Sequence, residues 1–221
     1  YTDANGLVQS MPYNLLTYSE QFDNAAWDKS NATITANDTI APNGTTTADK
    51  LVENSSSAIH RISQVITNKN VIFYFYAKAA ERTKVAINSP SVDVGFDLVN
   101  FTVINLGYGT TNAAIESVGA GWAKCSLFTT DTNPTLFIAL LNESAQLSYL
   151  GNGTSGVYIY GAQVNQGSTA LPYFATTTRL NLARVDYKDN VNGSLLLEPQ
   201  RTNLITWSNS NNLNFALDNV S

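Results

Sequence analysis

The sequence predicts an all-β protein built as an antiparallel sandwich of two sheets. Short runs that alternate apolar and polar residues recur about every 12 residues, and they are rich in Val, Ile, Thr and aromatic side chains. Turn-forming residues separate the runs, as in PNG at Pro42, GYG at Gly107 and GNG at Gly151. Many short strands with this spacing are typical of antiparallel sandwiches.

The first predicted element is a short helix over residues 19–27 (SEQFDNAAW). Ser19 can cap its N-terminus and Glu20 lies in its first turn. The runs that follow are predicted as strands over residues 31–36, 58–66, 71–78, 83–87, 92–96, 101–104, 113–118, 122–129, 135–141 and 156–164.

Residues 179–203 differ in character from the rest of the chain. An Asn192-Gly193 step, which favours a tight turn, lies between RLNLARVDY and SLLLEPQ. This pattern predicts a β-hairpin. Because an isolated two-stranded hairpin is marginal in water, we interpret it as a connector that packs on a neighbour.

The opening phrase of the chain returns near its end. NLLTYS begins at Asn14 and NLITWS at Asn203, while YTDANGL at Tyr1 matches YKDNVNGSL at Tyr187. Repetition over this distance predicts whole domains in tandem. The expected organisation is the end of a preceding connector (1–13), a sandwich module (14–178), the hairpin connector (179–202) and the beginning of a second module (203–221).

Composition excludes several partners. Charged residues make up 13% of the chain, the net charge is −5 and the isoelectric point is about 4.7. The basic residues are scattered singly, which argues against nucleic acid. No run approaches the length of apolar sequence that spans a bilayer, so membrane insertion is not expected. Cys125 is the only cysteine, so no disulfide forms within the chain.

Five segments resemble a module that is common in bacteriophage structural proteins, head and tail fibres and spikes among them. They are NLLTYSEQFDNAAWDKS at Asn14, APNGTTTADKLVE at Ala41, FYFYAKAAER at Phe73, AAIESVGAGWAKCSL at Ala113 and GVYIYGAQVNQGS at Gly156. The resemblance implies a jelly-roll sandwich similar to carbohydrate-binding modules. It also implies a place on the virion surface, outside the cell.

The same resemblance assigns structural anchors. Its opening pairs an Asn-Leu step with a Phe and a Trp, here Asn14, Phe22 and Trp27. Trp122 begins a strand after a turn, and we expect it to be a buried anchor as well. Modules of this shape often hold a structural calcium through an acidic residue in the last strand, but residues 157–164 contain no carboxylate. No metal and no cofactor are therefore expected.

Catalysis is argued against by elimination. His60 is the only histidine, and its place beside Arg61 in a predicted strand puts it at the surface or rim. With Cys125 it cannot complete a zinc site within one chain. Asp93 and Asp97 share one strand face, and we interpret them as solvent-facing charges rather than a glycosidase pair.

Aromatic side chains alternate along two of the predicted strands. One set is assigned to the core: Phe73, Phe75, Val157 and Ile159. The opposite set projects from the outer face of the sheet: Tyr74, Tyr76, Lys78, Tyr158 and Tyr160. Tyrosine, with an apolar body and a polar tip, suits a glycan platform, a subunit interface or a surface covered by the chain's own loops.

The resulting prediction is a non-catalytic structural and glycan-adhesion module of a phage-like virion fibre or spike. Expected partners are further copies of the chain, with a trimer favoured, other virion proteins, and a host cell-surface glycan. Two alternatives stay open. One is a purely structural oligomerisation or capsid-attachment element that binds no sugar, and the other is an accessory domain of a glycan-degrading tailspike.

Overall fold

A computed structural model describes residues 13–89, 92–108, 112–132, 134–178, 184–186 and 194–196. The chain divides into two units. Met11–Leu182 holds a β-sandwich, and the other unit contains the two short strands β15 (Arg184–Asp186) and β16 (Ser194–Leu196). Residues 1–12 and 203–221, predicted as the end of one connector and the start of a second module, lie outside the described residues.

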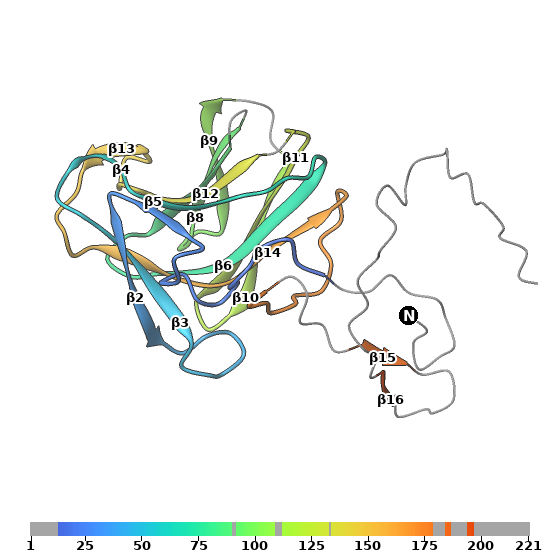
Figure 1. Cartoon of the computed structure of the whole chain (residues 1–221). Coiled ribbons are helices and arrows are strands. Elements are labelled where there is room, and N and C mark those ends of the chain that lie inside the picture. The colour runs from blue at the N-terminus through green and yellow to red at the C-terminus, as the bar shows by residue number, and fades with distance from the viewer. Residues whose placement is uncertain are drawn as a thin grey trace, which may run out of the picture. The chain divides into compact units, whose positions relative to one another are not determined.

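The sandwich consists of two six-stranded antiparallel sheets (Figure 1). Sheet I contains, in spatial order, β1 (Asp28–Ser30), β5 (Arg61–Val65), β12 (Thr135–Leu141), β7 (Lys84–Asn88), β8 (Asp93–Asp97) and β9 (Thr102–Tyr108). Sheet II contains β10 (Asn112–Gly119), β11 (Trp122–Thr129), β6 (Val71–Ala79), β14 (Gly156–Gln166), β3 (Ala48–Glu53) and β2 (Ala32–Thr39). A small third sheet pairs β4 (Ser57–Ile59) with β13 (Ser148–Leu150). The predicted all-β sandwich is confirmed.

The chain repeatedly crosses from one sheet to the other. It runs from β3 in sheet II to β5 in sheet I, back to β6 and again to β7. It does the same along β11, β12 and β14. Such alternation gives the jelly-roll type of sandwich its connectivity. Among the described residues, no helix is long and apolar enough to cross a membrane.

The core lies between the two sheets. Phe73, Phe75, Val157 and Ile159 have no exposed surface, which confirms the predicted inward set. Cys125 is buried among them, and burial raises the pKa of its thiol far above the ordinary value. The thiol is therefore protonated at neutral pH and serves as a small apolar core group.

A bulge in β14 changes which side chains face inward. Tyr160 pairs with Tyr76 and Gln163 pairs with Tyr74, so β14 uses one more residue than β6 between these points. Gly161 takes φ of +56° at the bulge. Beyond it, even-numbered residues face the core and Gln163 faces outward, where it binds a covering segment described below.

The predicted helix over residues 19–27 is wrong. This segment forms successive turns, in which the amides of Gln21, Asn24 and Trp27 each donate to a carbonyl three residues earlier. The backbone of Ser19 is bonded elsewhere, because its amide donates to Thr176 and its carbonyl accepts from Ala162. These long-range bonds replace the ones that a helix would form.

The sequence patterns missed one central strand, β3, but predicted the hairpin near the end of the chain. β3 reads ADKLVE and pairs with both β2 and β14, although half of its residues are charged. At the other end of the chain, β15 and β16 pair antiparallel, with Arg184 opposite Leu196 and Asp186 opposite Ser194. The two strands of the predicted hairpin therefore pair with each other, while the Asn192-Gly193 step lies outside the described residues.

Candidate functional site

The sequence-predicted tyrosines share the outer face of sheet II. Tyr76 lies opposite Tyr160 and Lys78 lies opposite Tyr158 in the pairing of β6 with β14. The ring centres of Tyr74 and Tyr76 are 6.1 Å apart, as are those of Tyr76 and Tyr160. The strand pattern thus brings these side chains together.

Two of the tyrosines are nevertheless closed off from solvent. Tyr74 has no exposed surface and Tyr160 is 4% exposed, so the chain itself covers both of them on this outer face. The covering element is residues 168–178, which we call the strap. Tyr74 donates its hydroxyl to the carbonyl of Leu171 at 2.8 Å. The ring of Tyr173 packs 5.9 Å from that of Tyr160 and 6.2 Å from that of Tyr76.

Buried amides fix the strap in place. Gln163 donates to the carbonyls of Leu171 and Pro172 and accepts from the amide of Phe174 at 2.6 Å. A Cβ at Gly161 would lie only 3.1 Å from the Tyr173 ring, so the bulge leaves room for that ring. Of the three interpretations of the tyrosine face, coverage by the chain's own loops describes Tyr74 and Tyr160.

The remaining residues of this face are only partly accessible. Trp122 is 1% exposed and packs with Tyr160 on the outer face rather than between the sheets. Lys78 and Tyr158 are half-buried. The ammonium of Lys124 lies 4.1 Å from the centre of the Tyr74 ring. The buried rings of Tyr74, Tyr160 and Trp122 are therefore not available for stacking against a sugar.

The anchor residues join the beginning of the module to its end. Asn14 is 4% exposed and donates to the carbonyls of Ala162 and Phe174 at 2.9 and 3.1 Å. Its side-chain oxygen accepts from the amides of Leu16 and Val164, both at 3.0 Å. All four hydrogen-bonding positions of the amide are therefore used.

The two aromatic anchors pack against each other in the main core. Phe22 has no exposed surface and Trp27 is 1% exposed, with ring centres 4.9 Å apart. The indole of Trp27 donates to the carbonyl of Tyr18 at 3.0 Å. Both rings belong to the main core, so the turns of residues 19–27 are held by burial rather than by helical bonds.

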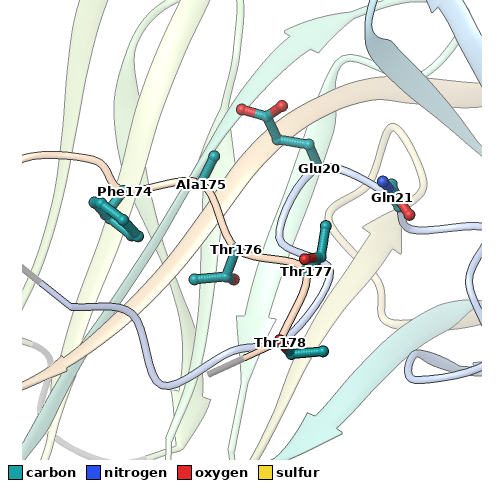
Figure 2. Close-up of a pocket in the computed structure, with 7 residues that line it drawn as sticks. All are labelled: Glu20, Gln21, Phe174, Ala175, Thr176, Thr177 and Thr178. Carbon is teal, nitrogen blue, oxygen red and sulfur yellow. The ribbon is translucent and has the colours of Figure 1, made fainter. Parts of the chain in front are cut away.

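A small hollow lies where the strap passes the first turns (Figure 2). Its volume is about 170 Å³, and it is lined by Glu20, Gln21, Phe174, Ala175, Thr176, Thr177 and Thr178. One carboxylate oxygen of Glu20 already accepts the hydroxyl of Tyr160 at 2.7 Å. The hollow is smaller than the roughly 300 Å³ of ordinary ligand pockets, so it does not present itself as a ligand site.

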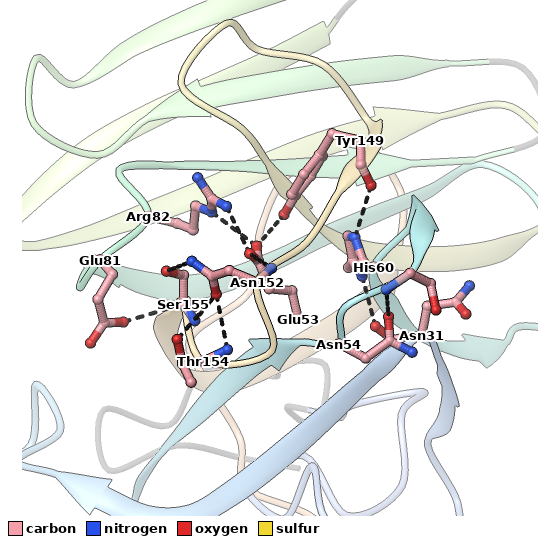
Figure 3. A network of polar contacts seen from close by, with 12 residues as sticks. Asn31, Glu53, Asn54, His60, Glu81, Arg82, Tyr149, Asn152, Thr154 and Ser155 are labelled. Atoms are coloured by element: carbon pink, nitrogen blue, oxygen red, sulfur yellow. Dashed lines mark hydrogen bonds and ion pairs between the residues drawn. The ribbon is translucent and has the colours of Figure 1, made fainter.

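A buried ion pair joins Glu53, at the end of β3, to Arg82 (Figure 3). The side chain of Glu53 is fully buried and accepts two bonds from Arg82, at 2.9 and 2.7 Å. It also accepts from the hydroxyl of Tyr149 at 2.6 Å and the amide of Asn152 at 2.9 Å. Burial alone would raise the pKa of Glu53, but the bonds from Arg82 and Tyr149 outweigh it, so the pKa lies below its ordinary value.

His60 lies beside this network and not at the surface as predicted. It has no exposed surface, and its ring nitrogens lie 2.8 Å from the carbonyl oxygen of Asn31 and 3.3 Å from that of Tyr149 (Figure 3). A neutral imidazole donates from one nitrogen only, and the shorter contact to Asn31 has the better hydrogen-bond distance. The buried ring is thus a structural group between β4 and β5. In the part of the chain that the structure describes, no cluster of three or more His, Cys, Asp or Glu could hold a metal ion.

Asp49 is a second buried carboxylate. It is 1% exposed and accepts from the amides of Phe22 and Asn37 at 3.0 and 2.9 Å. Burial raises the pKa of Asp49 to about 6, although these two amide bonds favour the ionised form. This carboxylate thus titrates near neutral pH and links the first turns to sheet II.

We expect the free energy of unfolding to be about 1 kcal/mol lower at pH 7 than at pH 5. At pH 5 Asp49 is protonated in the folded chain but ionised in the unfolded chain, whose pKa is near 3.8, and this difference in proton binding stabilises the fold. At pH 7 Asp49 is ionised in both states, so this stabilisation is lost. Urea unfolding at both pH values measures the difference. The Asp49→Asn variant should lose most of it, which separates Asp49 from Asp93, whose pKa burial also raises. The same change in stability between pH 5 and pH 7 in the wild type and in Asp49→Asn would contradict the expectation.

The outer face of sheet I carries a group of side chains that the sequence did not single out. Cross-strand pairing places Ser63, Phe137, Asn88 and Asp93 in one row across β5, β12, β7 and β8. Arg61 lies diagonally beside Phe137, with its guanidinium carbon 4.0 Å from the ring centre. Asn88 donates its side-chain amide to the carboxylate of Asp93.

This row borders a part of sheet I that the chain covers itself. Ala86, Ala139 and Leu141 are fully buried on the same outer face, beneath a cluster that includes Leu106, Ala145 and Leu147. A groove of about 520 Å³ runs between β9 and residues 144–147. In contrast, Arg61, Phe137, Asn88 and Asp93 are each half-buried. These four residues keep part of their surface open to solvent, and we call them the uncovered half of this face.

Comparisons with known proteins give little. No model of a known protein family matches the chain, and no curated protein matches it. The solved structures that are similar in part include the enzymatically active domain of tailspike protein 4 of bacteriophage CBA120. The two share 15% sequence identity over 69% of this chain, with a TM-score of 0.41. The chain spans only 21% of that structure.

Proposed function

We propose that the chain is a non-catalytic structural and glycan-adhesion module of a phage-like virion fibre or spike. The sequence resemblance to phage structural modules and the returning phrase at Asn14 and Asn203 support the virion role. The module would be used in tandem, in homo-oligomers or with other virion proteins.

The structural part of the proposal rests on the hydrogen bonds that join the two ends of the sandwich, which we call the clamp. Asn14 bonds to Phe174, and the amides of Tyr18 and Ser19 donate to Thr177 and Thr176. The chain therefore enters and leaves the module side by side in an antiparallel arrangement. A module whose two ends are bonded to each other in this way is suited to serial repetition.

The uncovered half of sheet I supports the adhesion part. It presents an aromatic ring, a guanidinium, an amide and a carboxylate on rigid strands, which are the groups that recognise sugar rings and hydroxyls. Repetition would raise the avidity of such weak sites. The non-catalytic assignment is supported by the complete burial of His60 and by the bonds that Arg82 donates to Glu53.

A second candidate function is favoured by the covered tyrosine face. Tyr74 and Tyr160 lie under the strap, so the face with most aromatic residues is unavailable to sugar. A purely structural module without sugar binding is consistent with that arrangement. Detection of sugar binding at any surface would favour the first candidate over this one.

Immunogold electron microscopy tests the virion role. Antibodies raised against the chain would be applied to purified particles of the virus that encodes it. We expect gold label on fibres or spikes at the particle surface. Intact, reactive antibody that labels no particle component would overturn the proposal.

A further inference from the structure

We propose that the uncovered half of the outer face of sheet I binds a saccharide that carries a carboxylate. Arg61 would hold the carboxylate, and Asn88 and Asp93 would bind hydroxyl groups further along the ligand. This inference rests on the adhesion part of the proposed function and names the ligand class and the residues for it.

Arg61 is the cation that points to an acidic ligand. Among the described residues, ion pairs occupy Lys50, Arg82 and Lys84, whereas Arg61 makes only its contact with the face of Phe137. Stacking on the ring fixes the plane of the guanidinium and leaves its N–H edge for a ligand. A carboxylate fits that edge, because its two oxygens match two parallel N–H donors.

Asn88 and Asp93 lie at the far end of the row that contains Phe137. The guanidinium of Arg61 lies over Phe137 on β12, and β8 is two strands from β12, so Asp93 is about 10 Å from this charge at the spacing of neighbouring strands. That distance is slightly more than the screening length of about 8 Å at physiological salt, so salt weakens the repulsion between Asp93 and an anion bound at Arg61. It also matches a ligand of two or three sugar rings laid across the strands. The amide and carboxylate together offer donors and acceptors for hydroxyls.

The covered half of the face forms a wall along this row. Ala139 and Ala86 occupy the next row, where Ala145 and Leu147 pack over them. A Cβ on Gly95 would meet Leu141 at 2.9 Å and Ile104 at 3.1 Å. The absence of a side chain at Gly95 therefore lets Leu141 and Ile104 pack close to its backbone. A saccharide on the row thus has one apolar flank and the rigid strands beneath it.

An array of sialylated and uronic-acid glycans, each printed beside its neutral counterpart, tests the inference with the full chain. We expect binding to acidic members, and at least a tenfold loss of affinity in Arg61→Gln when the best ligand is titrated by calorimetry. Lys124→Gln, which removes the matching ring-stacked cation from sheet II, should bind like the wild type. Arg61→Lys keeps the charge without the planar fork and should fall between them.

The outcomes separate the two proposals. If no glycan of either kind binds, the adhesion function itself fails, and this inference fails with it. If glycans bind but neutral members bind as well as acidic ones, or if both Arg61 variants bind undiminished, only the inference is overturned. Circular dichroism of each variant establishes that it is folded before affinities are compared.

Discussion

Replacing Asn14 with Ala is expected to lower the free energy of unfolding by about 4 kcal/mol. The substitution leaves the amides of Leu16 and Val164 and the carbonyls of Ala162 and Phe174 without their buried partner. Each such group costs about 1 kcal/mol or more when its bond is lost away from water. Urea denaturation followed by tryptophan fluorescence measures the change.

A matched asparagine serves as the control for this prediction. Asn105 is exposed and accepts one bond from the amide of Gly107 at 2.8 Å, so Asn105→Ala should cost about 1 kcal/mol or less. The clamp would be refuted as a main source of stability if Asn14→Ala and Asn105→Ala had similar effects.

Replacing Arg82 with Met is expected to cost about 3 to 5 kcal/mol at pH 7. The carboxylate of Glu53 stays fully buried and loses its cation, which is the costly way to break an interior ion pair. The deficit should shrink as the pH falls. In the wild type, the lowered pKa of Glu53 gives stability that is present above the unfolded pKa and lost as the pH falls through the folded value.

Lys50→Met provides the comparison for Arg82→Met. Lys50 pairs with Glu81 at 2.8 Å, but the Glu81 side chain is 52% exposed. Exposed pairs contribute about 1 kcal/mol or less, so this variant should unfold almost like the wild type. An Arg82→Met variant that lies within about 1 kcal/mol of the wild type at pH 7 would contradict the role assigned to the buried pair.

Alternating apolar residues made most of the strands predictable. The inward set of β6 and β14 follows directly from a period of two, because both strands have one face in the core. β3 was missed because Asp49 and Glu53 in ADKLVE read as exposed charges. They are buried, since amides and Arg82 satisfy them through contacts between residues far apart in the sequence.

The errors at the candidate site have the same origin. The pattern placed Tyr74 and Tyr160 on an outer face, but it carried no sign that the strap would return across them. The helix over residues 19–27 failed because Ser19 bonds to Thr176 and Ala162 instead of to its own turn. The row on sheet I joins residues from separate strands, so only the register of β5, β12, β7 and β8 reveals it.

The most direct measurement is a chemical-shift titration of the isotope-labelled chain with an acidic glycan that binds on the array. We predict that the largest shifts fall on Arg61, Phe137 and Asn88 in sheet I, while Tyr74 and Tyr160 beneath the strap stay unchanged. Shifts centred on the tyrosine face of sheet II, with sheet I unaffected, would contradict it.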